Sequence, residues 1–361
     1  MNNILKDYNE LIKYLKDNNI DNIFMVSFKY KEEPLLIKKL KDNNIKLTFY
    51  HGYTPNPKYE EVLEGLKEFN KTKSKCIIAL GGGSCIDVAK CIKGYATLDP
   101  NKSYLEQEII DNDIILIAVP TTAGTGSEST RYSVIYKDGV KQSVHSNYII
   151  PNKVLFDSSF LVTLPIYQKK ATMLDTFSHA IESFWSVNRN TESIEYAKKS
   201  LELVLNNKDE YIKENKKVFD NMLLASYYAG CAINITATTA GHALAYKLTT
   251  LYGISHGHAT ALINSELLPY MIENTKDKGL LKIFDDLKYV LKLNNINELK
   301  DYIRNILDDM DIYNVNYNYD DLDVLVKSVN LDRLKNNPYK LNEIDIKNIY
   351  INLFKEIERR K

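Results

Sequence analysis

The chain has 361 residues, a length that favours two domains, and its 47 basic residues balance its 47 acidic ones. This balance argues against nucleic acid or an anionic membrane surface as a partner, because either would be attracted by a net positive charge. No apolar run reaches the ~20 residues of a membrane span. The segment Met1–Asp7 lacks an apolar signal region, and the four cysteines form no Cys-x-x-Cys pair. We therefore expect a cytoplasmic protein with reduced thiols.

The first part of the chain alternates short apolar runs with helical patterns. Such alternation is typical of an α/β domain whose mostly parallel, Rossmann-like sheet is covered by helices on both faces. A β-hairpin is expected next, because two short runs flank the turn Lys137-Asp-Gly139. The predicted strands span 23–26, 45–49, 76–80 and 114–119, the predicted helices span 33–41, 59–69 and 84–93, and the hairpin strands span 132–136 and 141–144.

Two polar, glycine-containing loops follow two of these strands. The first is Gly81-Gly-Gly-Ser84, which leads directly into a helix, and the second is Pro120-Thr-Thr-Ala-Gly-Thr-Gly-Ser-Glu128. Glycines let backbone N–H groups approach a phosphate, and a helix N-terminus adds a favourable dipole. The first loop alone is equally compatible with a tight strand-to-helix turn. Two such loops at the carboxyl ends of strands predict a nucleotide or phosphate ligand.

Beyond Pro165 the pattern is helical to the end of the chain. The sequence therefore predicts an α/β domain over residues 1–160 and an all-helical domain over residues 161–361, with the boundary between Asp157 and Pro165.

One aspartate and three histidines of the helical part offer a ligand set for a divalent metal. Asp175 and His179 lie four residues apart, and such a pair falls on one face of a helix. His242 lies in an apolar helical run, and His256 follows Gly253 at an expected loop or helix start. Imidazole and carboxylate together favour Fe²⁺, Zn²⁺, Co²⁺ or Ni²⁺ over Mg²⁺ or Ca²⁺. Each histidine taken alone is also compatible with an ordinary core or surface position.

These motifs together resemble the iron-containing (group III) alcohol dehydrogenase family, whose relatives include glycerol dehydrogenase and dehydroquinate synthase. The resemblance also includes Pro55-Asn-Pro57 and extends over nearly the whole chain. It implies the dehydroquinate synthase-like fold, a small-molecule aldehyde or alcohol substrate, NADH or NADPH, and a divalent metal, iron or else zinc. The implied metal ligands are Asp175, His179, His242 and His256, and the implied cofactor-binding residues are Gly82, Gly83, Ser84, Asp87, Thr121, Thr122 and Thr125.

The resemblance also implies a reaction. The metal would polarise a carbonyl for reduction, or lower the pKa of an alcohol for oxidation, while the nicotinamide exchanges a hydride with the adjacent carbon. Many family members have a further histidine four residues after the third ligand, but this chain has Tyr246 there. The phenol is a poor proton shuttle at its ordinary pKa, and it either donates a hydrogen bond or only packs beside the nicotinamide.

Two further departures concern the cofactor and the assembly. Where the family usually has an aspartate that selects NAD, this chain has Phe28 followed by Lys29, which favours acceptance of NADP. The N-terminus lacks the short strand with which many relatives begin. That segment contributes to dimer contacts in the family. The sequence therefore leaves the oligomeric state open, with a homodimer as one possible state.

Within the family, several segments look most like phosphonoacetaldehyde reductases, which form 2-hydroxyethylphosphonate. A phosphonate requires cationic or N–H donors, and Arg131, Lys247 and His258 are candidates for them. Each is also compatible with a solvated charge or a salt bridge. Three alternatives stay open: a general short-chain alcohol dehydrogenase of the butanol or propanediol type, a non-redox lyase of the dehydroquinate synthase type, and a nucleotide-sensing protein with a structural metal.

Overall fold

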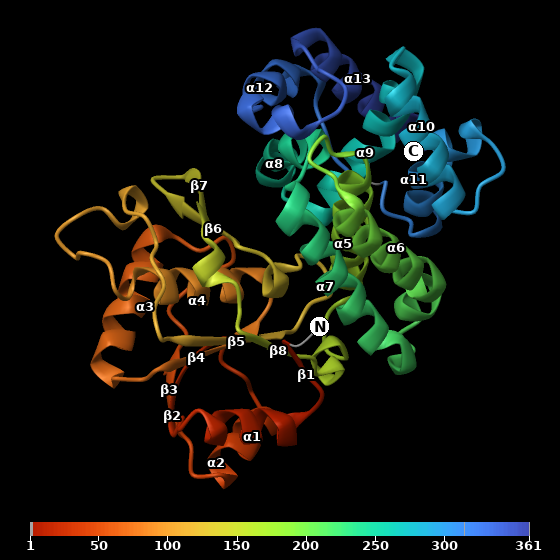
Figure 1. Cartoon of the computed structure of the whole chain (residues 1–361). Helices are drawn as coiled ribbons and strands as arrows, with labels where there is room; N and C mark the ends of the chain where they lie inside the picture. Colours follow the sequence, from red (N-terminus) through yellow and green to blue (C-terminus); the bar gives the residue numbers. More distant parts are fainter. Residues whose placement is uncertain (1–2, 314, 361) are drawn as a thin grey trace. The chain divides into compact units, whose positions relative to one another are not determined.

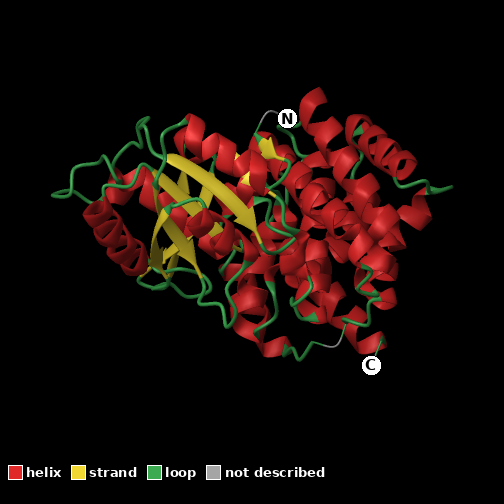
Figure 2. Cartoon of the chain, turned by 90° about the horizontal axis from the view of Figure 1, so that it is seen from below, coloured by secondary structure: helices red, strands yellow, loops and turns green. Residues whose placement is uncertain are grey.

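The computed structural model describes residues 3–313 and 315–360, which form two compact units, Met1–Thr163 and Leu164–Lys361. Every strand among the described residues belongs to the first unit, and the second is helical (Figure 2). Among the described residues, no helix is both long and apolar enough to span a bilayer.

The first unit contains a six-stranded parallel sheet with the strand order β1-β8-β5-β4-β2-β3. The chain runs outward from β2 to β3, returns to β4 on the other side of β2, and continues to β5. The strand order therefore reverses between β2 and β4, where open α/β sheets bind ligands. The strands are β1 Ile4–Leu5, β2 Asn22–Ser27, β3 Lys46–Tyr50, β4 Cys76–Gly81, β5 Ile115–Pro120 and β8 Lys153–Leu155.

Helices cover both faces of this sheet, as the alternating pattern predicts. Helices α1 (Tyr8–Asp17) and α2 (Leu35–Asp42) pack on one face, and α3 (Tyr59–Thr72) and α4 (Gly83–Tyr95) pack on the other (Figure 1). β4 is buried along its whole length. Its unbroken apolar run is therefore that of a central strand rather than of an edge strand.

The predicted strands and helices of this unit are confirmed to within three residues at each end. The hairpin is confirmed as β6 (Tyr132–Lys137) paired with β7 (Val140–His145). Its turn has positive φ angles at Asp138 and Gly139, as a two-residue hairpin turn of this kind requires. The expected absence of a short N-terminal strand is wrong. Strand β1 pairs in parallel with β8, although two residues are too few for a periodic pattern.

The second unit is all-helical in its described residues, which confirms the predicted fold class. Helix α5 begins directly after Pro165 and buries most of its residues, including Asp175 and His179. The apolar run predicted around His242 is divided into α7 and α8, because Ala237 has a φ of 54° and ends α7. The helices are α5 Ile166–Trp185, α6 Thr191–Ile212, α7 Phe219–Thr236, α8 Ala240–Tyr252, α9 His256–Asn274, α10 Lys278–Val290, α11 Ile296–Asp309, α12 Leu322–Lys327 and α13 Glu343–Arg359.

Candidate metal centre and nucleotide loops

Three helices of the second unit bring the four predicted metal ligands together. Asp175 and His179 come from α5, His242 from the first turn of α8, and His256 is the first residue of α9. Ligand atoms of Asp175, His242 and His256 lie within 4.8 Å of one another. His179 Nε2 is 4.0 Å from Asp175 Oδ1, and the His179 ring stacks on that of His242 at 4.5 Å.

The inward-facing atoms of this cluster fit a divalent cation. Asp175 Oδ1 and His242 Nε2 are both buried, lie 3.6 Å apart and accept or donate no hydrogen bond among the described residues. A buried polar atom left in this way costs ~1–3 kcal/mol. Two donors bound at ~2.1 Å to one ion are at most about 4.2 Å apart. A small side-chain adjustment would therefore let the cluster bind one ion and satisfy both atoms.

Glu182 holds the opposite edge of the His242 ring. Its Oε1 lies 2.7 Å from His242 Nδ1 and accepts a hydrogen bond from Asn264 Nδ2 at 2.9 Å. Its Oε2 accepts hydrogen bonds from the backbone N–H and the hydroxyl of Thr239, both at 2.7 Å. Trp185 in turn donates to Thr239 Oγ1. Because Nδ1–H donates to the carboxylate, Nε2 is the nitrogen left for a metal.

Two glycines allow the three helices to approach so closely. A side chain on Gly241 would place its first carbon 2.0 Å from Asn264 Oδ1 and 2.4 Å from Glu182 Oε1. A side chain on Gly257 would meet the carbonyl oxygen of Ala171 at 2.1 Å, beside Asp175. Each glycine is adjacent to a candidate ligand in the sequence. The close packing therefore serves the cluster directly.

The charges of the site couple metal uptake to proton release. Burial by itself would lower the pKa of His242, but Glu182 and Asp175 outweigh it and raise that pKa to about 10. Burial would raise the pKa of Glu182, but His242, Asn264 and Thr239 lower it to about 2. Without a cation His242 is therefore protonated, and a metal at Nε2 has to displace a proton.

Tyr246 and His258 lie beside the cluster in different roles. The Tyr246 ring stacks flat on the His256 imidazole, with centroids 5.0 Å apart and planes 3° apart. His258 is buried, and Tyr167 Oη lies 3.1 Å from its Nδ1 while its Nε2 lies 2.6 Å from the carbonyl oxygen of Ile312. Burial lowers the pKa of His258 to about 4, so the ring is neutral and fully engaged. His258 is therefore not free to bind a substrate anion, contrary to the expectation from the sequence.

In the first unit, the two predicted nucleotide loops lie against each other. β4 and β5 are paired as far as Gly81 and Pro120, and the backbone N–H of Thr121 donates to the carbonyl of Gly81. A side chain on Gly82 would meet Thr122 at 3.2 Å, and one on Gly83 would meet Thr125 at 2.7 Å. Helix α4 begins at Gly83 without a side-chain N-cap. Its N-terminus is therefore suited to an anion.

Other predicted cofactor residues differ in what they contact. Asp87 is half-buried, and its two oxygens accept hydrogen bonds from Ser127 Oγ and Val134 N. It therefore ties α4 to the second loop and to β6 instead of facing a nucleotide. Ser84 Oγ accepts a hydrogen bond from Asn56 N. Phe28 follows β2 with 42% of its surface exposed, packs on Tyr53, and is the aromatic residue at the point where the strand order reverses.

Substitution of Gly83 by alanine should weaken dinucleotide binding and leave the metal centre intact. The new carbon would push Thr125 out of its place against α4. We expect KM for the nicotinamide cofactor to rise about tenfold, equivalent to ~1.4 kcal/mol. Steady-state kinetics together with metal analysis test this. An unchanged KM would mean that the first loop is only a strand-to-helix turn, whereas loss of metal would point to general misfolding.

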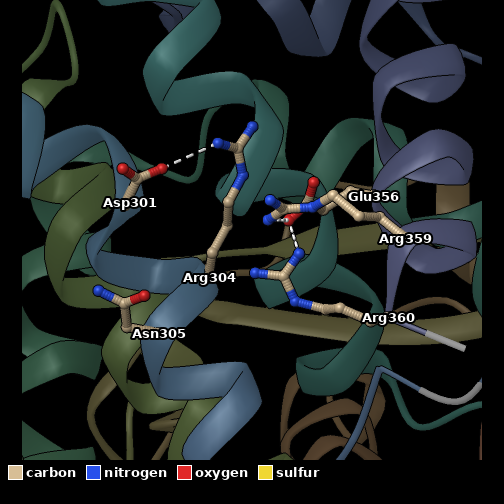
Figure 3. A pocket seen from close by; sticks show the side chains of 6 residues that line it. All are labelled: Asp301, Arg304, Asn305, Glu356, Arg359 and Arg360. Carbon is tan, nitrogen blue, oxygen red and sulfur yellow. Dashed lines mark hydrogen bonds and ion pairs between the residues drawn. The ribbon is translucent and has the colours of Figure 1, made fainter.

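A separate pocket of about 450 Å³ lies among α11 and α13 in the second unit (Figure 3). Its guanidinium groups are paired with carboxylates: Arg304 with Asp301, Arg359 with Glu356, and Arg360 with Glu356. It contains none of the four candidate metal ligands. Each of its guanidinium groups already has a carboxylate partner, so the pocket offers no unpaired cation for a substrate.

Comparisons with known proteins agree with this arrangement. The family model for iron-containing alcohol dehydrogenase matches residues 6–158, and that for the C-terminal part of the Fe-containing alcohol dehydrogenase family matches residues 169–354. The chain therefore belongs to the iron-containing alcohol dehydrogenase family.

Three curated relatives illustrate the range of this family. Alcohol dehydrogenase 4 of Schizosaccharomyces pombe is 32% identical over 59% of this chain and 52% of its own length. The 4-hydroxybutyrate dehydrogenase of Clostridium kluyveri is 27% identical over 83% of this chain and 81% of its own length. The NADPH-dependent butanol dehydrogenase of Clostridium saccharobutylicum is 28% identical over 72% of this chain and 68% of its own length. The match to the first of these relatives thus spans only about half of its length.

Solved structures resemble the chain over nearly its full length. A crystal structure of an iron-containing alcohol dehydrogenase superimposes with a TM-score of 0.82 at 26% identity and covers 95% of each chain. A 1,3-propanediol oxidoreductase superimposes with a TM-score of 0.87 at 24% identity and covers 97% of each. At that identity the second comparison bears on the fold alone, and both agree with the predicted fold class.

Proposed function

We propose that this chain is a metal-dependent, NAD(P)-linked oxidoreductase that interconverts short aldehydes and alcohols. The observation that carries the proposal is the convergence of Asp175, His179, His242 and His256, with two inward atoms that have no hydrogen-bond partner among the described residues. Family membership supplies the reaction class. The paired loops after β4 and β5 supply a suitable phosphate cradle.

Each residue set has a distinct task. Asp175, His179, His242 and His256 would hold the metal, and Glu182 would fix the His242 ring with Nε2 facing inward. When bound, the metal would act as a Lewis acid on a carbonyl or alcohol oxygen, and the nicotinamide would exchange a hydride with the adjacent carbon. Tyr246 would support the His256 ring from the side.

Residues 82–84 and Thr121, Thr122 and Thr125 would cradle the pyrophosphate of the dinucleotide. No carboxylate follows β2 directly, because Phe28 and the exposed Lys29 occupy these positions. A 2′-phosphate is therefore not repelled there, and we propose that NADPH is accepted. The NADPH dependence stated for the butanol dehydrogenase relative is in line with this proposal.

For the substrate, we propose phosphonoacetaldehyde, because segments 133–139, 182–188 and 241–253 resemble phosphonoacetaldehyde reductases and because the cationic Lys247 follows Tyr246 on α8. The second candidate is a neutral short-chain aldehyde or alcohol, which the name of the butanol dehydrogenase relative favours. Both candidate substrates would be reduced by the same chemistry. They differ only at the end remote from the carbonyl, where phosphonoacetaldehyde would need a cationic protein group to bind its phosphonate.

Both candidates can be tested by following NAD(P)H absorbance with a panel of aldehydes that includes phosphonoacetaldehyde, propanal and butanal. We expect reduction of at least one aldehyde, measurable turnover with NADPH, and about one divalent metal ion per chain. A metal-containing protein that oxidises neither NADH nor NADPH with any aldehyde would contradict the proposal. That result would favour a lyase or a nucleotide-sensing protein instead.

A further inference from the structure

Arg333 lies one aromatic ring away from a candidate metal ligand. It belongs to the short 3-10 helix η7 (Leu331–Asn336), which packs against α8 in the second unit. Its guanidinium carbon is 4.9 Å from the centroid of the Tyr246 ring, and Tyr246 stacks on His256. A guanidinium over an aromatic face is attracted to it electrostatically, and this contact holds the Arg333 side chain at the Tyr246 ring.

The guanidinium of Arg333 is also available for a ligand. Within residues 3–313 and 315–360, it has no hydrogen bond and no ion pair, although the side chain is partly buried. The neighbouring Asp332 forms an ion pair with Lys335 instead. The other five arginines contact protein groups, namely Arg131, Arg189, Arg304, Arg359 and Arg360.

From these contacts we infer that Arg333 binds the anionic end of the substrate, and that the natural substrate is a short aldehyde with a phosphonate, sulfonate or carboxylate group. The inference rests on the proposed function and specifies the substrate class. A guanidinium presents two parallel N–H donors to such an anion, a geometry that a lysine does not offer. The contact with Tyr246 holds this group one aromatic ring away from His256.

Arg333 is thus the main candidate for recognition of the anion, ahead of the three residues that the sequence suggested, Arg131, Lys247 and His258. Lys247 follows Tyr246 on α8 and has no ion pair with a described residue, so it is a second, weaker donor. Arg131 lies in the first unit and donates to the hydroxyl of Tyr132, whose ring it also contacts. The relative that is a 4-hydroxybutyrate dehydrogenase shows that the family includes an enzyme named for an anionic alcohol.

The test uses two matched substrate pairs, phosphonoacetaldehyde with propanal and succinic semialdehyde with butanal, on the metal-loaded enzyme. We expect the wild-type enzyme to favour the anionic member of at least one pair. Arg333→Ala should lower kcat/KM for that member at least tenfold, mainly through KM, and change the value for the neutral partner less than twofold. For Arg333→Lys we expect a kcat/KM on the anionic aldehyde between those of the wild type and Arg333→Ala. Arg359→Ala is the matched control and should behave as wild type.

The outcomes separate this inference from the proposed function. The anion site is refuted if the wild-type enzyme reduces propanal and butanal but does not favour either anionic aldehyde. It is also refuted if Arg333→Ala lowers kcat/KM equally for charged and neutral aldehydes. In both cases the proposed oxidoreductase function is unaffected. If no aldehyde is reduced, the proposed function fails first. Metal content is measured for every variant. If Arg333→Ala lost metal and lost kcat/KM equally on all substrates, Arg333 would support the His256 ring, and its role in substrate binding would be overturned.

Discussion

Replacement of His256 by alanine should abolish bound metal and turnover together. His256 supplies one of the ligand atoms that lie within 4.8 Å of one another, and its loss leaves Asp175 and the two histidines of α5 and α8. Loss of an outer-shell partner typically lowers metal affinity or activity 10–100-fold. We therefore expect a loss of more than about 100-fold in kcat, with metal below one tenth of the wild-type content.

The control for this variant is His145→Ala, which removes an exposed histidine from β7 in the first unit. It should retain wild-type metal content and turnover. Metal analysis by mass spectrometry and NAD(P)H kinetics, performed on the same preparations, give the answer. Full activity of His256→Ala with retained metal would show that His256 is not a ligand.

Substitution of Glu182 by glutamine should weaken the metal centre without removing a ligand. The carboxylate accepts hydrogen bonds at both oxygens, from Asn264 and from Thr239, and pairs with His242 Nδ1. A glutamine would present its NH₂ group to one of these donors and would remove the charge that holds His242. We expect metal affinity to fall ~10–100-fold, and the free energy of unfolding to fall by ~1–3 kcal/mol.

A titration of turnover against added metal distinguishes this positioning role from loss of a ligand. At saturating metal, Glu182→Gln should recover most of the wild-type kcat, whereas His256→Ala should not. Glu202→Gln on the exposed face of α6 is the matched control and should leave the titration unchanged. An unaltered metal affinity in Glu182→Gln would contradict the role of this carboxylate.

Much of the fold could be predicted from local patterns. The central strands β4 and β5 are continuous apolar runs, and Pro165 precedes α5 directly, so periodicity alone places them. Strand β1 could not be found in this way, because it has two residues and is defined only by its pairing with β8. The break between α7 and α8 is likewise invisible in the apolar pattern, since it depends on the backbone conformation of Ala237.

Residues of the candidate site could be predicted from the sequence where a helical spacing or a known motif marked them. Asp175 and His179 follow from an i, i+4 pair, and Glu182 lies three residues after His179 on the same buried helix. That spacing was a usable signal for a supporting carboxylate, but only the contacts with Thr239 and Asn264 reveal its role. Arg333 carries no sequence signal at all. Its place beside Tyr246 arises from the packing of η7 on α8.

The most direct test of the central claim is aldehyde reduction by the protein before and after removal of its metal. We expect the chelated, metal-free protein to lose turnover with both NADH and NADPH. Addition of Fe²⁺ or Zn²⁺ under anaerobic conditions should restore turnover in proportion to the metal bound, up to about one ion per chain. Full turnover by protein shown to be metal-free would contradict the account.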